Sequence, residues 1–342
     1  MKRNIDMRIY SPRSWGKLSI FVALCVVGIS AASPVQAQRS VWQRGATLQK
    51  LYAGAAGEGP AWHPKIGLVA SHGSVYLLRD DEAPQVYKKD LGTNGLMWDA
   101  EGRLWCCQPS KNRVIRFEAD GSETVVTEKF ENAPYNQPND ITIDKAGRIY
   151  FSDPKYGPYE NLPQQDDKGR PVEGVYRVDT DGIVTRVIAH EVDRPNGVLI
   201  TRDQKYLYVA GNNNSVKGGE RKLFRFEVMD CCGTVLLDTK KLVYDWGSSR
   251  GPDGMAEDVK GNIYVAGGLN SDDVAVEDNS QKGGIYVFSP TGKLIDFMAV
   301  KVDEVTNCAF GGNDLKTLYI TAGGTLFSIQ TKNRGVITAA KK

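Results

Sequence analysis

The stretch QPNDITIDKAGRIYFSD, residues 137–153, decides the fold because its pattern returns along most of the chain. Each copy begins with Asn, Asp or Glu, continues with an apolar run and a turn signal, and ends in an alternating strand. Periods of 36 to 57 residues separate the copies, and such periods are typical of propeller blades or of a solenoid. The leading residues of the six copies are Glu58, Asn94, Asn139, Asn196, Asp253 and Asn307.

Four short strands fit within each interval. In the third copy we expect strands at residues 141–144, 148–152, 174–179 and 183–188, separated by Gly-containing turn signals. Four antiparallel strands make one blade, and a closed ring of blades removes exposed sheet edges. The sequence therefore predicts an all-β fold, a six-bladed β-propeller with four antiparallel strands per blade.

Closure of the ring is predicted from the two ends of the chain. The last copy lacks a convincing fourth strand, because residues 331–342 are polar and basic. Residues 46–53, ATLQKLYA, have strand character and precede the first copy. We predict that this N-terminal strand completes the sixth blade.

The first 37 residues differ in kind from the rest. Five basic residues precede the apolar run 18–32, and VQA at 35–37 offers a cleavage site, as in a secretory signal peptide. A retained membrane anchor is the alternative, but a run of about 15 residues is short for a span of roughly 20. We expect cleavage after Ala37, a single propeller domain over residues 38–342, and a periplasmic or secreted protein that has no membrane contact after cleavage.

Composition agrees with a β-rich chain and excludes one class of partner. The 342 residues include 36 Gly and 15 Pro, spread evenly, which indicates many turns. The formal net charge is +2, with basic and acidic residues interspersed. No basic stripe is present in the sequence, so we expect no nucleic-acid partner.

Two cysteine doublets occur in the chain. Cys106 and Cys107 lie in a predicted alternating strand, where neighbouring side chains point to opposite faces. Cys231 and Cys232 precede a Gly in a predicted turn, where a vicinal bond or a cross-pair is conceivable. Neither doublet has zinc-site spacing, and we interpret both as structural.

The leading residues of the copies carry the candidate chemistry. The innermost strand of a propeller blade runs along the central axis, so the six leading side chains converge at the mouth of the channel. Their oxygens, with formal charges at Glu58 and Asp253, suit Ca²⁺, Mg²⁺ or Mn²⁺ better than zinc. Asn and Asp before Gly are also ordinary turn residues. Glu58 is not a usual turn former, however, and Pro precedes Asn139, Asn196 and Asp253.

Five motifs, in order, resemble a known family. The strings EGPAW, QPNDITID with FSDPKYG, RPNGV, GPDGMAED and TNCAFGG are similar to the SMP-30/gluconolactonase/luciferin-regenerating-enzyme family of six-bladed propellers. That family also resembles diisopropylfluorophosphatase. The resemblance implies one divalent metal ion at the channel mouth, usually Ca²⁺, with Mg²⁺, Mn²⁺ or Zn²⁺ as other possibilities.

The resemblance also assigns roles to particular residues. Asp253 matches the family's catalytic acid, to which a base or nucleophile role is given. Some sugar-lactone members carry Arg at the position of Gln137, and Tyr156 begins a polar loop, residues 156–173, expected to overhang the site. The implied metal ligands are Glu58, Asn139, Asn196 and Asp253. The expected substrate contacts are Asn94, Gln137, Asn139, Asn307 and Tyr156.

The function implied is that of a divalent-metal-dependent hydrolase of the gluconolactonase type. It would open a small sugar (aldono)lactone to the free acid, with a metal-polarised carbonyl and water attack assisted by Asp253. One alternative is phosphotriester hydrolysis on the same metal site. The other is a propeller that binds a ligand or protein without catalysis, because fold does not fix function.

Overall fold

The structure is a computed structural model that describes residues 40–79, 82–157, 162–272 and 275–336. The expected signal peptide, residues 1–37, lies outside the described residues. No helix within these ranges has the length and apolarity needed to cross a membrane.

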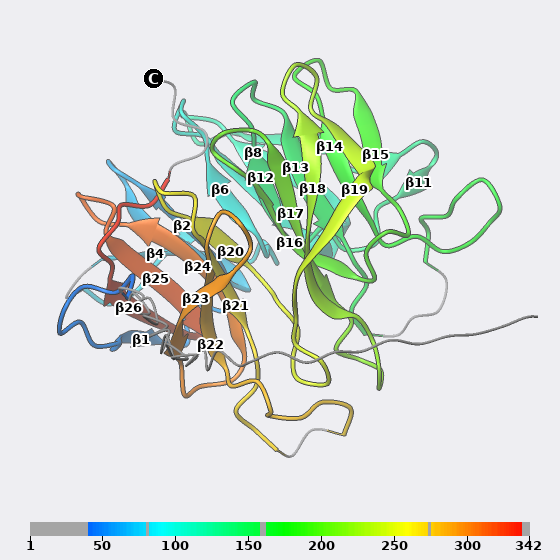
Figure 1. Ribbon diagram of the computed structural model, residues 1–342. Helices are drawn as coiled ribbons and strands as arrows, with labels where there is room; N and C mark the ends of the chain where they lie inside the picture. Colours follow the sequence, from blue (N-terminus) through cyan, green and yellow to red (C-terminus); the bar gives the residue numbers. More distant parts are fainter. Residues whose placement is uncertain (1–39, 80–81, 158–161, 273–274, 337–342) are drawn as a thin grey trace, which may run out of the picture. The chain divides into compact units, whose positions relative to one another are not determined.

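Six four-stranded antiparallel sheets account for nearly all regular structure (Figure 1). The first two are β2 (Glu58–His63), β3 (Gly67–His72), β4 (Ser74–Leu78), β5 (Gln85–Lys88), and β6 (Leu96–Trp98), β7 (Leu104–Gln108), β8 (Arg113–Phe117), β9 (Glu123–Thr127). The third and fourth are β12 (Ile141–Ile143), β13 (Ile149–Asp153), β14 (Gly174–Val178), β15 (Val184–Ile188), and β16 (Pro195–Ile200), β17 (Tyr206–Asn212), β18 (Arg221–Met229), β19 (Thr234–Asp245). The fifth is β20 (Met255–Glu257), β21 (Ile263–Gly267), β22 (Gly284–Phe288), β23 (Leu294–Ala299).

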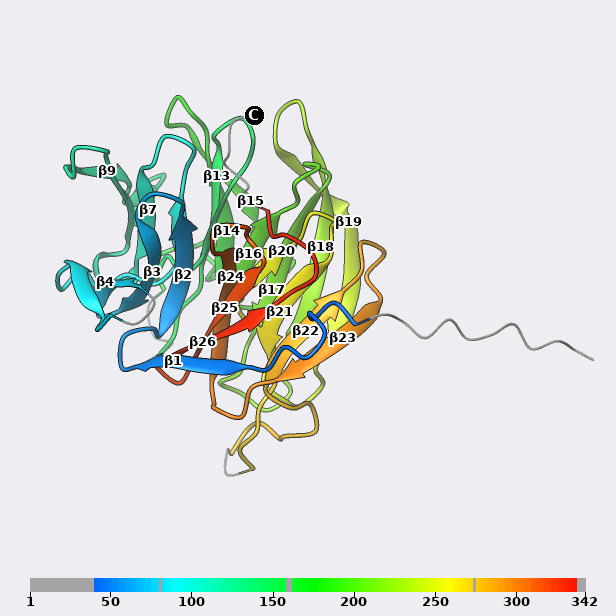
Figure 2. The ribbon, with the colours of Figure 1, turned by 90° about the vertical axis from the view of Figure 1, so that its left-hand side faces the viewer.

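The sixth sheet joins the two ends of the described chain. Its strands are β24 (Val305–Gly311), β25 (Thr317–Ala322), β26 (Thr325–Gln330) and β1 (Gln49–Ala53). β1 pairs antiparallel with β26, from Gln49 opposite Ser328 to Ala53 opposite Thr325, and the two strands lie side by side in Figure 2. The prediction that an N-terminal strand completes the last blade is confirmed.

The innermost strands close a ring. Contacts link β2 to β6, β6 to β12, β12 to β16, β16 to β20, β20 to β24, and β24 back to β2. The fold is therefore the expected six-bladed β-propeller. The strands predicted for the third blade agree with β12 to β15 to within one residue at each end.

Each seam between neighbouring blades holds an apolar cluster. Between the second and third blades, for example, Trp105 of β7 packs with Phe151 and Tyr176 of β13 and β14. Phe151 and Tyr176 stack with ring centroids 5.5 Å apart. Such burial of large side chains stabilises the ring, at about 25 cal/mol per Å² of apolar surface.

The side chains of Cys106 and Cys107 point to opposite faces of β7, as expected for neighbouring residues in a strand. Cys106 packs in the cluster between the first and second blades, whereas Cys107 packs in the cluster between the second and third. Both thiols are free and buried. Burial raises the pKa of both thiols, as expected for inert core cysteines.

Candidate active site

The six leading residues lie where the innermost strands begin. Glu58 is the first residue of β2, and Asn196 is the second of β16. Asn307 is the third residue of β24, while Asn94, Asn139 and Asp253 each precede their strand by two positions.

Glycines after the leading residues allow neighbouring blades to approach closely. Gly95 N donates to Asn139 O at 2.7 Å, and a Cβ added at Gly95 would lie 2.6 Å from that oxygen. A Cβ added at Gly59, where φ is +52°, would overlap Asn94 O. Glycine is required at both positions because no side-chain atom fits between the blades.

The same arrangement recurs on the other half of the ring. A Cβ at Gly197 would overlap Asp253 O, and one at Gly254 would overlap the side-chain amide of Asn307. Asn307 Nδ2 in turn lies 3.5 Å from Glu58 Oε2. Leading residues from successive blades thus adjoin one another, including across the closure between β24 and β2.

Two buried carboxyl groups at this mouth, those of Glu58 and Asp253, interact electrostatically. Burial, with the nearby charge of Asp140, raises the pKa of Glu58 to about 8. Burial raises the pKa of Asp253 well above its usual range, and the charge of Glu58 adds to that effect. Each carboxylate therefore disfavours the charged form of the other, and both would be stabilised as anions by a bound cation.

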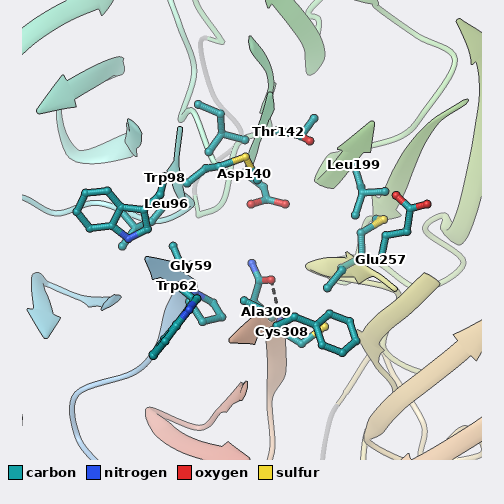
Figure 3. A pocket seen from close by; sticks show the side chains of 18 of the residues that line it. Gly59, Trp62, Leu96, Trp98, Asp140, Thr142, Leu199, Glu257, Cys308 and Ala309 are labelled. Atoms are coloured by element: carbon teal, nitrogen blue, oxygen red, sulfur yellow. Dashed lines mark hydrogen bonds between the residues drawn. The ribbon is translucent and has the colours of Figure 1, made fainter. Parts of the chain in front are cut away.

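Asp140 is a site residue that we did not single out from the sequence. It follows Asn139, lines the channel that continues from the mouth, and points into that cavity in Figure 3. Its Oδ2 accepts from Val198 N at 3.1 Å, which ties the third blade to the fourth. Burial raises its pKa to about 6.

A signal for Asp140 was present in the repeat. The residue after the leading position is Gly in four copies, and only Asp140 and Cys308 depart from Gly. Both residues line the channel. Where the other copies require Gly, a residue with a side chain must have room for that side chain, and here the room is the central channel.

Tyr156 joins the polar loop to the mouth. Its hydroxyl accepts from Asn196 Nδ2 at 2.6 Å and donates to Asn212 Oδ1 at 3.1 Å. The guanidinium of Arg194 lies 5.4 Å from the centre of its ring. Burial raises the pKa of Tyr156, with the nearby charge of Asp253 contributing, so the hydroxyl stays protonated. It fixes the orientation of the Asn196 amide.

Gln137 supports that loop from the third blade. Gln137 Oε1 accepts from Tyr156 N at 2.7 Å, and Gln137 N donates to Asp153 Oδ1 at 2.8 Å. Asp153 also accepts from Asn136 N at 2.8 Å. Gln137 Oε1 is thus engaged in holding the backbone of Tyr156. Gln137 therefore has a positioning role in addition to the expected substrate contact.

Arg250 brings a positive charge to the acidic end of the mouth. Its guanidinium bonds Glu277 at 3.0 Å and also contacts Glu304. Its charge partly offsets the rise in the pKa of Asp253. Glu277 is fully buried in its side chain, so Arg250 is needed to compensate that carboxylate.

The oxygen atoms at the channel mouth fit a divalent cation. Asp253 Oδ1 and Asn94 Oδ1 are buried and have no hydrogen-bond partner among the described residues. Unsatisfied buried oxygens are uncommon unless an ion or water completes them. Within the described ranges, no three His, Cys, Asp or Glu side chains gather as a metal cluster. A metal here would therefore take amide as well as carboxylate oxygens, which suits a hard cation such as Ca²⁺.

The fold and the site together define the class: the protein is a six-bladed β-propeller with carboxylate and amide side chains at one end of its central channel. The chain belongs to the SMP-30/gluconolactonase/LRE-like family, whose model matches residues 56–324. This match spans all six leading residues.

Relatives with curated names are similar over most of the chain. A gluconolactonase of Zymomonas mobilis is 26% identical over 332 residues, covering 95% of this chain and 86% of the relative. The pentonolactonase XacC of Haloferax volcanii is 26% identical over 281 residues, covering 78% of this chain and 81% of the relative. Among solved structures, a gluconolactonase from Xanthomonas campestris has a TM-score of 0.69 and 26% identity, covering 85% of this chain and 91% of that one.

Proposed function

We propose that the protein is a lactone hydrolase of the gluconolactonase type, which uses a divalent cation, most simply Ca²⁺, to open a sugar lactone to its free acid. The observation that carries the proposal is the meeting of polar side chains from different blades at the channel mouth. Asn307 Nδ2 lies 3.5 Å from Glu58 Oε2, and the buried Asp253 Oδ1 has no hydrogen-bond partner in the described part of the chain. The raised pKa values of Glu58 and Asp253 agree with such a site, because perturbed carboxyl groups are typical of functional sites. The lactonase names of two relatives support the substrate class.

The residues that would hold the cation are Glu58, Asn139, Asn196 and Asp253. When bound, the cation polarises the lactone carbonyl and stabilises the negative charge that develops on its oxygen. Tyr156 keeps the Asn196 amide oriented, with its oxygen available as a ligand. A hydrogen bond to the far side of a metal ligand fixes the orientation in which that ligand meets the ion.

Proton transfer is assigned to Asp253. Its Oδ1, buried and without a protein partner in the described part of the chain, is available to accept a proton from the attacking water or to position that water. Asn94, Asn307 and Gln137 would contact the sugar hydroxyls of the substrate. Export by residues 1–37, to the periplasm or outside the cell, is part of the same proposal.

The test is aldonolactone hydrolysis followed by proton release, before and after chelation and after return of Ca²⁺, Mg²⁺ or Mn²⁺. We expect activity that chelation abolishes and one of the cations restores. Calorimetric binding of the same cation to the chelated protein gives a readout apart from activity. Absent or chelator-resistant turnover across several lactones would contradict the proposal.

Two alternative functions, a phosphotriesterase and a non-catalytic binding propeller, can be tested with the same purified protein. A phosphotriester panel separates lactonase from phosphotriesterase activity on one site. A non-catalytic binding propeller would show no turnover with either panel, while Asp253→Ala would retain folding and ligand binding.

A further inference from the structure

A second cluster of polarisable side chains lies between Asn196 and Asp253 in the chain, in a turn that carries none of the leading residues. The turn between β18 and β19 carries Cys231 and Cys232, both exposed and both free. Their Sγ atoms are 3.3 Å apart. The Cys231 thiol donates a hydrogen bond to the Cys232 sulfur across this separation, and no disulfide joins them.

The turn is held in place by the neighbouring third blade. Arg177 Nη1 donates to the carbonyls of Cys232 and Gly233, each at 3.0 Å, and Tyr150 OH donates to Gly233 O at 3.1 Å. Arg148 Nη2 donates to Asp230 O at 3.2 Å. Gly233 has φ of +65°, and a Cβ there would overlap the Tyr150 hydroxyl. The backbone on either side of the doublet is therefore fixed, and the two thiols are kept together.

The two cysteines differ in their surroundings. Cys232 Sγ lies 3.2 Å from the Thr234 hydroxyl. That contact, the Thr234 backbone, the Cys231 thiol and the charge of Arg148 lower the pKa of Cys232 to about 7. The pKa of Cys231 is raised, because its proton is shared with Cys232 and acidic Asp230 is nearby. Cys232 is thus the better nucleophile near neutral pH, and Cys231 is placed to resolve its adducts.

From this geometry we propose that Cys231 and Cys232 form a thiol–disulfide exchange site, a vicinal dithiol that takes small disulfides and thiophilic ligands. The Cys232 thiolate attacks one sulfur of a disulfide such as oxidised glutathione, forming a mixed disulfide and releasing one glutathione thiolate. Cys231 loses its proton to water and attacks the Cys232 sulfur, which releases the second glutathione thiolate. The two protein thiols are oxidised to one vicinal disulfide, and the glutathione disulfide is reduced to two thiols.

The buried cysteines provide an internal reference. Cys106, Cys107 and Cys308 are buried, and burial raises the pKa of each. These three thiols should not react in the folded protein. The sixth cysteine, Cys25, lies in the segment expected to be cleaved and outside the described residues, so it is replaced by Ser in every protein tested. Every thiol that then reacts under native conditions is assigned to the turn.

The experiment treats the folded protein with oxidised glutathione near neutral pH and follows intact mass. We expect the parent protein to lose the mass of two hydrogen atoms without accumulating a glutathione adduct, and peptide mapping to place the bond between Cys231 and Cys232. Cys231→Ser and Cys232→Ser should each stop at one stable glutathione adduct, with Cys231→Ser reacting faster. The double variant Cys231→Ser/Cys232→Ser should not react.

Several other outcomes would contradict the proposed exchange site. Stable glutathione adducts on the parent protein, covalent dimers, or no reaction at all would each exclude a vicinal exchange pair. Reaction of the double variant would assign the chemistry to the buried thiols instead. Phenylarsine oxide, which needs two thiols, gives a second readout: we expect it to bind the parent protein one to one, and equal binding to a single variant would contradict the proposal.

Discussion

Asn307 Nδ2 lies 3.5 Å from Glu58 Oε2, although the two residues are 249 positions apart in the chain. The contact crosses the seam where β24 of the last blade meets β2 of the first. It places the leading side chain of the last repeat against that of the first. The polar ring at the channel mouth therefore depends on the same closure that completes the propeller.

Replacing Asp253 by Asn should separate catalysis from folding. The change keeps the shape of the side chain and removes one of two carboxylates that disfavour each other's charge. We expect lactone hydrolysis to fall by at least about 100-fold and calcium binding to weaken, while the melting temperature of the chelated protein stays equal or rises. Asp238→Asn, on the exposed part of β19, is the charge-matched control. Full activity in Asp253→Asn would contradict the assigned role.

Tyr156→Phe should impair the site without removing a ligand. The variant loses the hydroxyl that accepts from Asn196 and donates to Asn212. We expect kcat/KM and cation affinity to fall by about 10-fold to 100-fold, as for other changes behind a metal ligand. Steady-state kinetics and calorimetry would measure this. Tyr76→Phe in β4 should leave both quantities unchanged, and an equal loss there would show that the effect is not local.

Asp153 should make stability depend on pH. Burial raises its pKa from 3.8 to about 8, so between these values the folded state binds a proton that the unfolded state has released. Its contribution to stability is present at low pH and is lost as pH rises toward 8, with a slope of up to about 1.4 kcal/mol per pH unit.

Asp153→Asn isolates that contribution, because the amide cannot ionise. Urea unfolding from pH 4 to pH 8 should show a smaller fall in unfolding free energy for the variant than for the parent protein. Parallel curves for the two proteins would exclude Asp153 as the source.

Gly254→Ala should disturb the ring directly. The added methyl would overlap the side-chain amide of Asn307, which must move away from Glu58. We expect a loss of about 1–3 kcal/mol in unfolding free energy, together with reduced lactone hydrolysis. Gly73→Asn is a suitable control, since Gly73 has φ of +74° and open space around it and Asn tolerates that conformation. A fully active, equally stable Gly254→Ala would contradict the close approach.

Replacing residues 49–53 with a Gly-Ser segment should open the ring. The sixth sheet would lose β1 and expose the edge of β26. An unpaired edge promotes aggregation, so we expect a lower melting temperature and soluble aggregates by size-exclusion chromatography. A monomeric protein with an unchanged melting temperature would show that β1 does not fasten the propeller.

The repeat by itself determined the all-β class, the number of blades and the strand that closes them. These follow from local signals, namely the period of the leading residues, the turn residues and the alternation within strands such as β13. The same alternation predicted that Cys106 and Cys107 point to opposite sides. The repeat also indicated which side chains begin each blade, from Glu58 to Asn307.

Only the tertiary structure decided how those side chains meet. The contact of Asn307 with Glu58, the bond from Asn196 to Tyr156, and the bond from Val198 to Asp140 each join residues from different blades or loops. Such contacts depend on blade packing, which no local pattern encodes. The contact between the Cys231 and Cys232 thiols likewise required the third blade, because Arg177 and its neighbours fix the turn from outside.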